Sequence, residues 1–276
     1  MARTKLGSPF RSLIRLTLYF LFTLILMPTQ AAALLLGLKS WLRIPMWYHG
    51  ICGRLLGFHL DIQGAITSDR PTLFVSNHSS YLDITILGSV IPGSFVAKSE
   101  VAGWPLFGWL AKLQRTVFVD RRRRTTHNQR DEMGRRLDAG DNLILFPEGT
   151  SNDGNRILPF RSALFSVAER TAGGGSGGQH LTIQPVSLAY THLNGVPLGR
   201  AYRPYLAWYG GMSLFSHLWR AAGLGRTTVR LRFHDPIDSA KFGSRKALSA
   251  YCQDAIAIGV ATALSGRPAG EAPRLR

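Results

Sequence analysis

The sequence predicts an α/β fold in which a mixed sheet is flanked by helices and preceded by a membrane-embedded helical segment. Between residues 60 and 236, short apolar stretches typical of buried strands alternate with longer amphipathic stretches, and this alternation favours an α/β sandwich. An uncharged run from Leu16 to Leu38 predicts the N-terminal segment, because about 20 apolar residues can cross a bilayer. A chain of 276 residues can hold one core and an appendage.

The first element is this N-terminal segment, residues 1–44, which we expect to be a membrane anchor. Basic residues stand on both sides of the uncharged run and favour a hairpin that returns to the cytoplasm: Arg3, Lys5, Arg11 and Arg15 before it, Lys39 and Arg43 after it. Pro28, near the middle, predicts two short helices in one leaflet rather than one span. The alternatives are a single span and a signal peptide cleaved near Ala31–Ala33.

Strands and helices then alternate through a main domain of residues 45–264. An amphipathic stretch from Trp47 to Phe58 leads to a first strand at Leu60–Ile62. Further strands are predicted at 73–76, 94–97, 117–119, 143–146, 183–188 and 228–233, with helices at 81–90, 104–113 and 126–139. A terminal helix over Ala247–Leu264 completes the domain, and residues 265–276 are predicted to form a disordered tail.

Two short motifs follow predicted strands of this domain. Asn77-His78-Ser79-Ser80-Tyr81-Leu82-Asp83 follows the apolar stretch Leu73–Val75, and Phe146-Pro147-Glu148-Gly149-Thr150 ends the apolar stretch Leu143–Phe146. Catalytic groups collect where the strands of an α/β sheet end, because the loops there converge on a crevice. The two motifs therefore predict a reaction site.

His78 and Asp83 form the candidate catalytic pair. Residues five apart on one helix point about 140° from each other, so His78 must lie in the strand-to-helix turn and Asp83 in the first helical turn. Asp83 would then fix the imidazole tautomer, and the other ring nitrogen could take a proton from a substrate hydroxyl. A structural reading competes with this one, since Ser80 and Asp83 also match a capping box; the two roles are compatible.

Four ordered blocks resemble the lysophospholipid acyltransferase family, whose best-known members are the 1-acyl-glycerol-3-phosphate acyltransferases. The blocks are Asn77 to Asp83, Val117-Phe118-Val119-Asp120-Arg121, Phe146 to Thr150, and Ile183-Gln184-Pro185-Val186. Two shorter stretches, Ala97-Lys98-Ser99-Glu100 and Gly103-Trp104-Pro105, also sit where the family has similar residues. The resemblance covers roughly Gly57 to Pro236, most of the chain.

The resemblance implies a membrane-bound enzyme that transfers an acyl chain from acyl-CoA or acyl carrier protein directly to a lysolipid hydroxyl. His78 would deprotonate that hydroxyl and Asp83 would orient His78. Glu148, Gly149 and Thr150 would position the acceptor, and Arg121 would face an acidic head group, where a guanidinium can bind two oxygens. The favoured acceptor is 1-acyl-glycerol-3-phosphate, which would give phosphatidic acid. Beyond the thioester co-substrate, no cofactor is expected.

Ser151 departs from the family pattern. In typical lysophosphatidate enzymes an arginine follows Glu-Gly-Thr and helps to hold the acceptor phosphate. Lys98, Arg156 or Arg161 could supply that charge here. The departure leaves lyso-ornithine lipid, a phosphorus-free bacterial lipid with a 3-hydroxyacyl group, as the alternative acceptor.

Other chemistries are disfavoured by local context. Gly174–Gly178 matches G-x-S-x-G, but a hydrolase elbow needs a strand before the serine, and here an amphipathic stretch precedes it, so we expect a flexible surface loop. Ser79 and Ser80 could suggest a nucleophile, yet sequence neighbours of a histidine rarely have the geometry of a triad. The other histidines and the isolated Cys52 and Cys252 lack metal-ligand spacing, so no metal site is expected.

The net charge of +17 indicates a polyanionic partner. An anionic bilayer attracts each nearby Lys or Arg by about 1 kcal/mol, and an acidic acyl carrier protein would be drawn to the same surface. Nucleic acid is disfavoured because no binding module is recognisable. We therefore expect an inner-membrane protein whose site faces the cytoplasm, where both thioesters occur. A non-catalytic lipid-binding protein is the remaining alternative, and intact His78, Asp83 and Glu148 argue against it.

Overall fold

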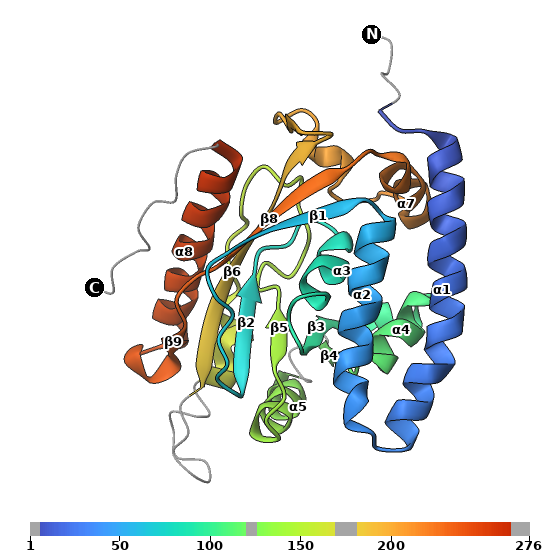
Figure 1. Ribbon diagram of the computed structural model, residues 1–276. Coiled ribbons are helices and arrows are strands. Elements are labelled where there is room, and N and C mark those ends of the chain that lie inside the picture. The colour runs from blue at the N-terminus through green and yellow to red at the C-terminus, as the bar shows by residue number, and fades with distance from the viewer. Residues whose placement is uncertain (1–5, 120–125, 169–180, 266–276) are drawn as a thin grey trace.

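A mixed β-sheet forms the centre of the protein in the computed structural model, which describes residues 6–119, 126–168 and 181–265 (Figure 1). The main path crosses β1 (Phe58–Gln63), β8 (Thr227–Phe233), β6 (Thr182–Leu193), β2 (Thr72–Ser76), β5 (Leu143–Leu145), β3 (Ser94–Lys98) and β4 (Val117–Val119). Two short strands, β7 (Val196–Pro197) and β9 (Ile237–Asp238), pair with β6. The predicted α/β fold with a mixed sheet is confirmed.

Strand direction places the sequence motifs at one edge of this sheet. The pairs β2–β5, β5–β3 and β3–β4 are all parallel, and β2 is also parallel to β6, whereas β6 and β8 are antiparallel. Because five neighbouring strands, β6, β2, β5, β3 and β4, run the same way, their carboxyl ends meet at one edge. The His78 loop follows β2, the Glu148 loop follows β5, and Lys98 is the last residue of β3.

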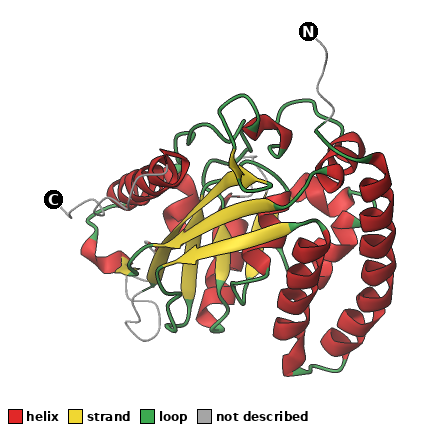
Figure 2. Ribbon diagram, turned by 45° about the horizontal axis from the view of Figure 1, so that its top comes forward, coloured by secondary structure: helices red, strands yellow, loops and turns green. Residues whose placement is uncertain are grey.

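Helices lie on both faces of the sheet (Figure 2). Side chains alternate across the sheet and build a hydrophobic core on each face. On β2, Phe74 faces one core while Leu73 and Val75 face the other. The first core is covered by α1 (Pro9–Leu35), α2 (Arg43–Leu55), α3 (Leu82–Gly88) and α7 (Leu214–Gly223). The second core is covered by α5 (Thr126–Asp138) and α8 (Arg245–Ser265). A further helix, α4 (Phe107–Leu113), lies beside α1 and α2 (Figure 1).

The N-terminal segment differs from the prediction of two short helices broken at Pro28. The structure has one continuous helix, α1, with Pro28 inside it, and that prediction is wrong. Proline removes the bond to the carbonyl of residue 24, but Leu24 is 59% exposed, so this carbonyl is on the outward side and is not trapped in the core. The chain turns at Gly37, whose φ is +63°, and α2 runs back beside α1 (Figure 1). A hairpin is therefore present, but its two arms are α1 and α2.

Polar contacts join the two arms of this hairpin and attach it to the domain. The Thr23 hydroxyl of α1 lies 2.9 Å from the Tyr48 hydroxyl of α2. Arg15, expected in the basic flank, turns inward and donates to the carbonyls of Leu56, Ala222 and Leu224 at 3.1, 3.1 and 2.7 Å. Its charge therefore stabilises the carboxyl ends of α2 and α7. The predicted boundary between residues 44 and 45 falls near the start of α2.

The other predicted elements agree with the structure to within a few residues, except that the strand predicted to end at Leu188 continues to Leu193. The prediction missed α7 and the short strands β7 and β9. The Gly174–Gly178 loop, Arg121 and the tail beyond Ser265 lie outside the described residues.

Candidate active site

The loops after β2 and β5 meet through a buried carboxylate. The backbone N–H of His78 donates to Glu148 Oε1 at 2.8 Å. Glu148 Oε2 accepts from Asn152 Nδ2 at 2.8 Å and from the backbone N–H of Leu158 at 3.0 Å. Burial raises the pKa of Glu148, while these three hydrogen bonds act in the opposite direction. Glu148 is 2% exposed, and its hydrogen bond to the His78 N–H holds the His78 loop in place.

The imidazole of His78 is oriented by Asp83, as the motif predicts. His78 Nδ1 lies 3.0 Å from Asp83 Oδ2, and the Asp83 side chain is fully buried while that of His78 is 20% exposed. An ionised carboxylate can only accept, so the proton lies on Nδ1 and Nε2 is left as a base. The ring stacks on Phe146 with centroids 4.1 Å apart. His78 therefore has one fixed tautomer and one partly exposed nitrogen.

Asp83 also caps the turn that leads into α3. Its Oδ2 atom accepts from the backbone N–H groups of Ser79 and Ser80 at 2.7 and 2.9 Å. The predicted capping role and the predicted pairing with His78 thus coexist in one carboxylate. The reciprocal bond of the capping box is absent, because the backbone N–H of Asp83 donates to the Ser80 carbonyl at 3.0 Å and not to the Ser80 hydroxyl.

Tyr190 of β6 is a further hydrogen-bond partner of Asp83, and the sequence did not predict it. Its hydroxyl donates to Asp83 Oδ1 at 2.8 Å. Burial first, and then the neighbouring Asp83 charge, raise the pKa of Tyr190 well above its ordinary value, so the phenol stays a donor. A strand extended beyond Leu188 would have placed Tyr190 on the same face as Leu188 and Val186, which is the face toward Asp83.

Asn77 and Asn152 were also missed. Asn77 pairs with the backbone of Leu188 on β6 through two hydrogen bonds of 2.9 Å. Asn152 Nδ2, besides contacting Glu148, donates to the carbonyl of His78 at 3.1 Å. Both amides hold the backbone that carries the histidine. An asparagine in a loop gives no signal of such a role in a single sequence.

The other predicted site residues lie around this centre. Gly149 has a φ of +67°, and a Cβ atom there would lie 3.0 Å from Arg161 Nε, so the glycine lets that arginine pack over the Glu148 loop. Thr150, Arg156 and Arg161 are exposed, and Lys98 is partly buried. This geometry does not favour the predicted contact between Glu148 and the acceptor. Both carboxylate oxygens of Glu148 already accept hydrogen bonds from protein N–H groups.

Ser151 has a structural partner. Its hydroxyl donates to the carbonyl of Trp208, whose own backbone N–H donates to the carbonyl of Ser79 at 2.9 Å. The Trp208 ring lies 5.8 Å from Tyr81 and 5.7 Å from Trp104 between centroids. Ser151 therefore helps to fix an aromatic wall beside the His78 loop.

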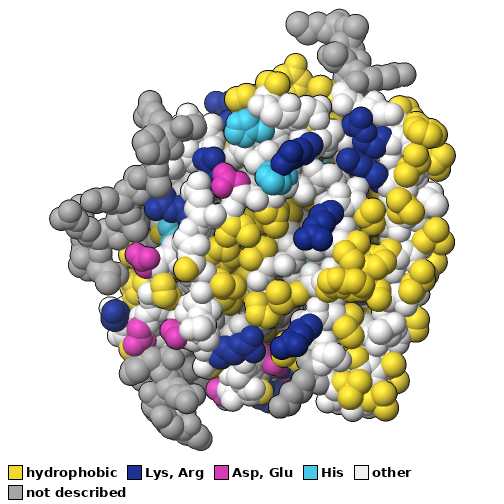
Figure 3. Space-filling model, in the orientation of Figure 1, with side chains coloured by type: hydrophobic (Ala, Val, Ile, Leu, Met, Phe, Trp, Pro, Cys, Tyr) yellow, Lys and Arg dark blue, Asp and Glu magenta, His cyan; other side chains and the backbone are white. Residues whose placement is uncertain are grey.

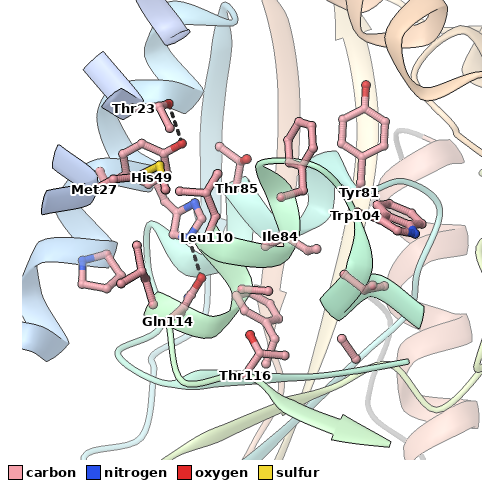
Figure 4. A pocket seen from close by; sticks show the side chains of 18 of the residues that line it. Thr23, Met27, His49, Tyr81, Ile84, Thr85, Trp104, Leu110, Gln114 and Thr116 are labelled. Carbon is pink, nitrogen blue, oxygen red and sulfur yellow. Dashed lines mark hydrogen bonds between the residues drawn. The ribbon is translucent and has the colours of Figure 1, made fainter. Parts of the chain in front are cut away.

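An apolar cavity begins beside the site and extends between α1, α2, α3 and α4 (Figure 4). Tyr81 and Phe95 line it, and Phe95 stacks on Phe146, the ring under His78, at 6.1 Å. Most of the other lining side chains are aliphatic or aromatic, among them Leu26, Met27, Ile84, Phe107 and Leu110. This arrangement can hold a hydrocarbon chain with one end near the imidazole.

The outer face of α1 carries a second apolar surface. Phe10, Leu13, Leu21 and Ile25 are between 54% and 71% exposed. Hydrophobic side chains gather along the edge of the molecule where Figure 1 places α1 (Figure 3). Both α1 and α8 are long and apolar enough to cross a membrane, but α8 buries Leu248, Cys252 and Ile256 in the second core.

Comparison with known proteins decides the family. A family model described as Acyltransferase matches residues 59–189. A protein of Brucella abortus (strain 2308), named lyso-ornithine lipid O-acyltransferase, is 43% identical over 231 residues, which are 83% of this chain and 86% of that protein. This chain belongs to the acyltransferase family. The predicted enzyme class, acyl transfer, is thereby confirmed.

Further relatives of this acyltransferase include both acceptor types considered above. A lyso-ornithine lipid O-acyltransferase of Rhizobium meliloti (strain 1021) is 40% identical over 84% of this chain and 80% of that protein. A 1-acyl-sn-glycerol-3-phosphate acyltransferase of Neisseria meningitidis is 33% identical over 68% of this chain and 69% of that protein. The crystal structure of the LPA acyltransferase PlsC from Thermotoga maritima matches with a TM-score of 0.68 and 22% identity, covering 95% of this chain and 99% of that one. That match concerns the fold.

Proposed function

We propose that this acyltransferase esterifies the hydroxyl of lyso-ornithine lipid with an acyl chain from acyl carrier protein or CoA, on the cytoplasmic face of a membrane. The oriented His78–Asp83 pair carries the reaction. The acceptor is favoured by the relatives of that name, which reach 43% identity over 83% of the chain, compared with 33% over 68% for the glycerophosphate enzyme. The family resemblance alone favours 1-acyl-glycerol-3-phosphate, whereas the more similar relatives favour lyso-ornithine lipid.

The reaction follows from the arrangement of His78 and Asp83. Nε2 of His78 takes the proton of the acceptor hydroxyl while that oxygen attacks the thioester carbonyl. The C–O bond forms, the C–S bond breaks, and the leaving thiolate takes the proton from the imidazolium. Asp83 stabilises the imidazolium between these steps. Glu148 does not contact the acceptor; it positions the His78 backbone.

The cavity between α1 and α4 suits the transferred chain. A lysolipid can leave its own chain in the bilayer, whereas the chain of a thioester arrives on a water-soluble carrier and must be shielded from water. Because the cavity begins at Tyr81 and Phe95, a chain inside it would present its carbonyl next to His78.

Ser151 supports an acceptor without phosphate. Its hydroxyl proton is used by the Trp208 carbonyl, so the position carries neither a cation nor a free hydrogen-bond donor. A phosphate monoester would gain nothing from it. A rival observation is Arg161, which packs over Gly149 and could approach a phosphate, so 1-acyl-glycerol-3-phosphate stays the second candidate acceptor.

The membrane role rests on α1, α4 and α7. Exposed aromatic side chains on the last two, Trp109, Phe215 and Trp219, accompany the apolar face of α1, and aromatic side chains favour the interface between lipid and water. Ser12 of α1 donates to the carbonyl of Trp219 at 2.8 Å, which places α7 against α1. The net charge of +17 would add attraction to anionic lipid.

An acceptor competition tests the proposal. The purified full chain receives a palmitoyl thioester with equal amounts of lyso-ornithine lipid and 1-acyl-glycerol-3-phosphate in vesicles, and both products are quantified by mass spectrometry. We expect ornithine lipid to dominate. Ser151→Arg should shift the product ratio toward phosphatidic acid by roughly ten- to a hundredfold, the value of a charge-assisted hydrogen bond of about 1.5–3 kcal/mol.

Ser151→Ala is the matched control, because it also loses the Trp208 contact but adds no charge. It should not favour the phosphate acceptor. If the native enzyme makes mainly phosphatidic acid, the acceptor assignment is wrong, and Arg156 and Arg161 become the cations to replace in turn.

A further inference from the structure

A surface groove along α2, away from the candidate active site, is lined by three arginines. Arg43 and Arg54 belong to α2, and Arg70 lies just before β2. All three are exposed, and within the described parts of the chain their guanidinium groups make no hydrogen bond or ion pair. None of the described residues that line the groove is acidic. The groove therefore presents positive charge that its own lining does not compensate, and an anion can bind there.

The wall of the groove between these arginines is apolar. Met46, Trp47 and Ile51 share one face of α2 with Arg43 and Arg54, because helix residues three or four apart are neighbours. At 1.5 Å per residue, this stripe runs about 16 Å along the helix. The groove encloses about 910 Å³, a volume that suits a small amphiphilic molecule. Charge and lining together indicate an anion that has an apolar part.

Trp47 connects the groove to the apolar outer surface of the α1–α2 hairpin. Its ring lies 5.8 Å from the ring of Phe22 on α1, between centroids, and Trp47 itself is exposed. Leu35 and Leu36, at the turn between the two helices, are also exposed. On the face shown in Figure 3, Lys and Arg side chains lie beside hydrophobic ones where Figure 1 places α2. The arginines thus border a surface that suits lipid chains.

The groove lies at the opposite edge of the sheet from the candidate base. Arg70 and Pro92, which both line it, precede β2 and β3, whereas His78 follows β2. The five residues of β2 span about 17 Å at 3.3 Å each. An acyl carrier protein docked in the groove would hold its thioester far from the imidazole. The position therefore favours a lipid as the occupant.

We propose that this groove binds an anionic phospholipid, with the phosphate on the arginines and the upper part of the lipid along Met46, Trp47 and Ile51. This phospholipid is neither the acceptor nor the donor of the acyl chain. The inference goes beyond the proposed function and takes from it only the contact with a membrane. The enzyme would then select membranes that contain anionic phospholipid, whichever lysolipid it acylates.

The test is equilibrium binding of single lipids to the purified full chain in neutral detergent micelles. The protein is titrated with a fluorescent phosphatidylglycerol and with a phosphatidylcholine of the same chains and label, and the two Kd values are compared. Phosphatidylglycerol should bind about ten- to a hundredfold more tightly, because its net charge is attracted by all three arginines. Inorganic phosphate at the same concentration should not displace it, because a free ion gains nothing from the apolar wall.

Arginine and tryptophan variants separate the two parts of the site. Arg43→Gln combined with Arg70→Gln should weaken the binding of phosphatidylglycerol at least about tenfold and leave that of phosphatidylcholine unchanged. Trp47→Ser should instead weaken the binding of both lipids by a similar factor, at least about threefold, because it removes apolar contact and no charge.

Lys241→Gln combined with Lys246→Gln is the matched control for the arginine variant. It removes the same amount of charge from exposed positions on α8 and just before it, on the opposite side of the molecule from α1 (Figure 1). Both Kd values should stay as they are in the native protein, because salt screens charges that lie more than about 10 Å away.

Three results would overturn the inference. Equal Kd values for the two lipids, or equal losses for the arginine and lysine variants, would mean that only net charge attracts lipid. Displacement of the lipid by inorganic phosphate would mean that the groove binds a free ion. If acyl carrier protein displaces the lipid and the arginine variant no longer binds the carrier, the groove is a carrier-docking surface. These measurements involve no acyl transfer, so the proposed function stands or fails separately.

Discussion

At the scale of single residues, the site is organised around one buried carboxylate with four hydrogen-bond donors. Asp83 receives the imidazole of His78, two backbone N–H groups and the hydroxyl of Tyr190. Such a carboxylate cannot rotate, so the imidazole it holds cannot rotate either. The orientation of the proposed base, His78, is therefore set before any substrate binds, which is the condition for efficient proton transfer.

Tyr190→Phe tests this arrangement. It removes one donor from Asp83 and nothing from the packing of the ring, so we expect kcat to fall roughly tenfold while KM changes little. The free energy of unfolding should fall by about 1.5–3 kcal/mol, because a hydrogen bond to a buried charge is lost. Steady-state kinetics measure kcat and KM, and urea unfolding measures the free energy of unfolding. An unchanged kcat would show that Tyr190 contributes only to packing.

Glu148→Gln tests the positioning role of the second motif. The carboxylate accepts from three N–H donors, whereas a glutamine must turn an NH₂ group toward at least one of them. If the amide oxygen faces Asn152 and Leu158, its nitrogen meets the N–H of His78 and displaces the histidine. We expect kcat to fall by about a hundredfold, as for a misplacement of about 1 Å.

The contradicting outcome for Glu148→Gln is a rise in the KM for the lysolipid with kcat preserved. That pattern would mean that Glu148 binds the acceptor directly. Glu148→Asp is the control, since it keeps the charge but shortens the reach to the His78 backbone, and it should also lower kcat.

The sequence predicts the three charged or titratable residues of this candidate site better than the residues that support them. His78, Asp83 and Glu148 follow apolar stretches that are readable as strands, so their meeting at one edge of the sheet could be expected. Tyr190 and Asn152 reach the site only through the order of the strands and the path of a loop. Alternation along β6 would have indicated the face of Tyr190 if the strand had been extended past Leu188, whereas nothing in local periodicity indicates Asn152.

At the scale of elements, α1 shows where local rules fail. Pro28 predicts a break, yet the helix continues because the bond it removes belongs to the outward side, and packing against α2 holds the helix on the inward side. The prediction also missed α7, which begins soon after Gly210 and Gly211 and in which His217 and Leu218 are buried but Phe215 and Trp219 are exposed. Short amphipathic helices with exposed aromatics are hard to distinguish from loops in a single sequence.

The exposed aromatics of α7 give a prediction at this scale. Phe215 and Trp219 are four residues apart, so both lie on one face, and they are 63% and 42% exposed. Replacing both by serine should weaken binding to anionic vesicles at least about tenfold, since burying one such side chain stabilises by about 1.5–3 kcal/mol. Vesicle co-sedimentation at several salt concentrations measures the effect.

Ile258→Ser is the matched control for this pair. Ile258 is 36% exposed on α8, on the opposite side of the molecule from α1 (Figure 1), and its replacement should not change vesicle binding. Equal losses for the control and for the α7 variant would place the membrane surface elsewhere.

At the scale of the whole molecule, the sheet separates two functions. One face carries the α1–α2 hairpin, α7 and the cavity, all of which suit lipid, while α5 and α8 close the other face. The His78 and Glu148 loops lie at the sheet edge where this layer meets the carboxyl ends of the strands. Under the proposed function, a lysolipid in the bilayer and a thioester from the cytoplasm would meet at that edge.

The general fold follows from the alternation of strands and helices, whereas the strand order does not. Nothing local in Phe58–Gln63 or Thr227–Phe233 indicates that these strands are parallel partners, since they are far apart in the chain. The pairing of these two strands depends on the whole core, because the apolar face of each strand is buried only when all the layers are assembled.

We propose above all that His78, oriented by its contact with Asp83, activates the hydroxyl of a lysolipid. The most direct measurement is the rate of acyl transfer to lyso-ornithine lipid by purified His78→Ala, with circular dichroism and vesicle binding confirming that the variant is folded and membrane-associated. We expect kcat to fall by a factor of about 10²–10⁴, the usual contribution of a general base. A folded His78→Ala variant that transfers acyl chains at a rate close to that of the native enzyme would contradict it.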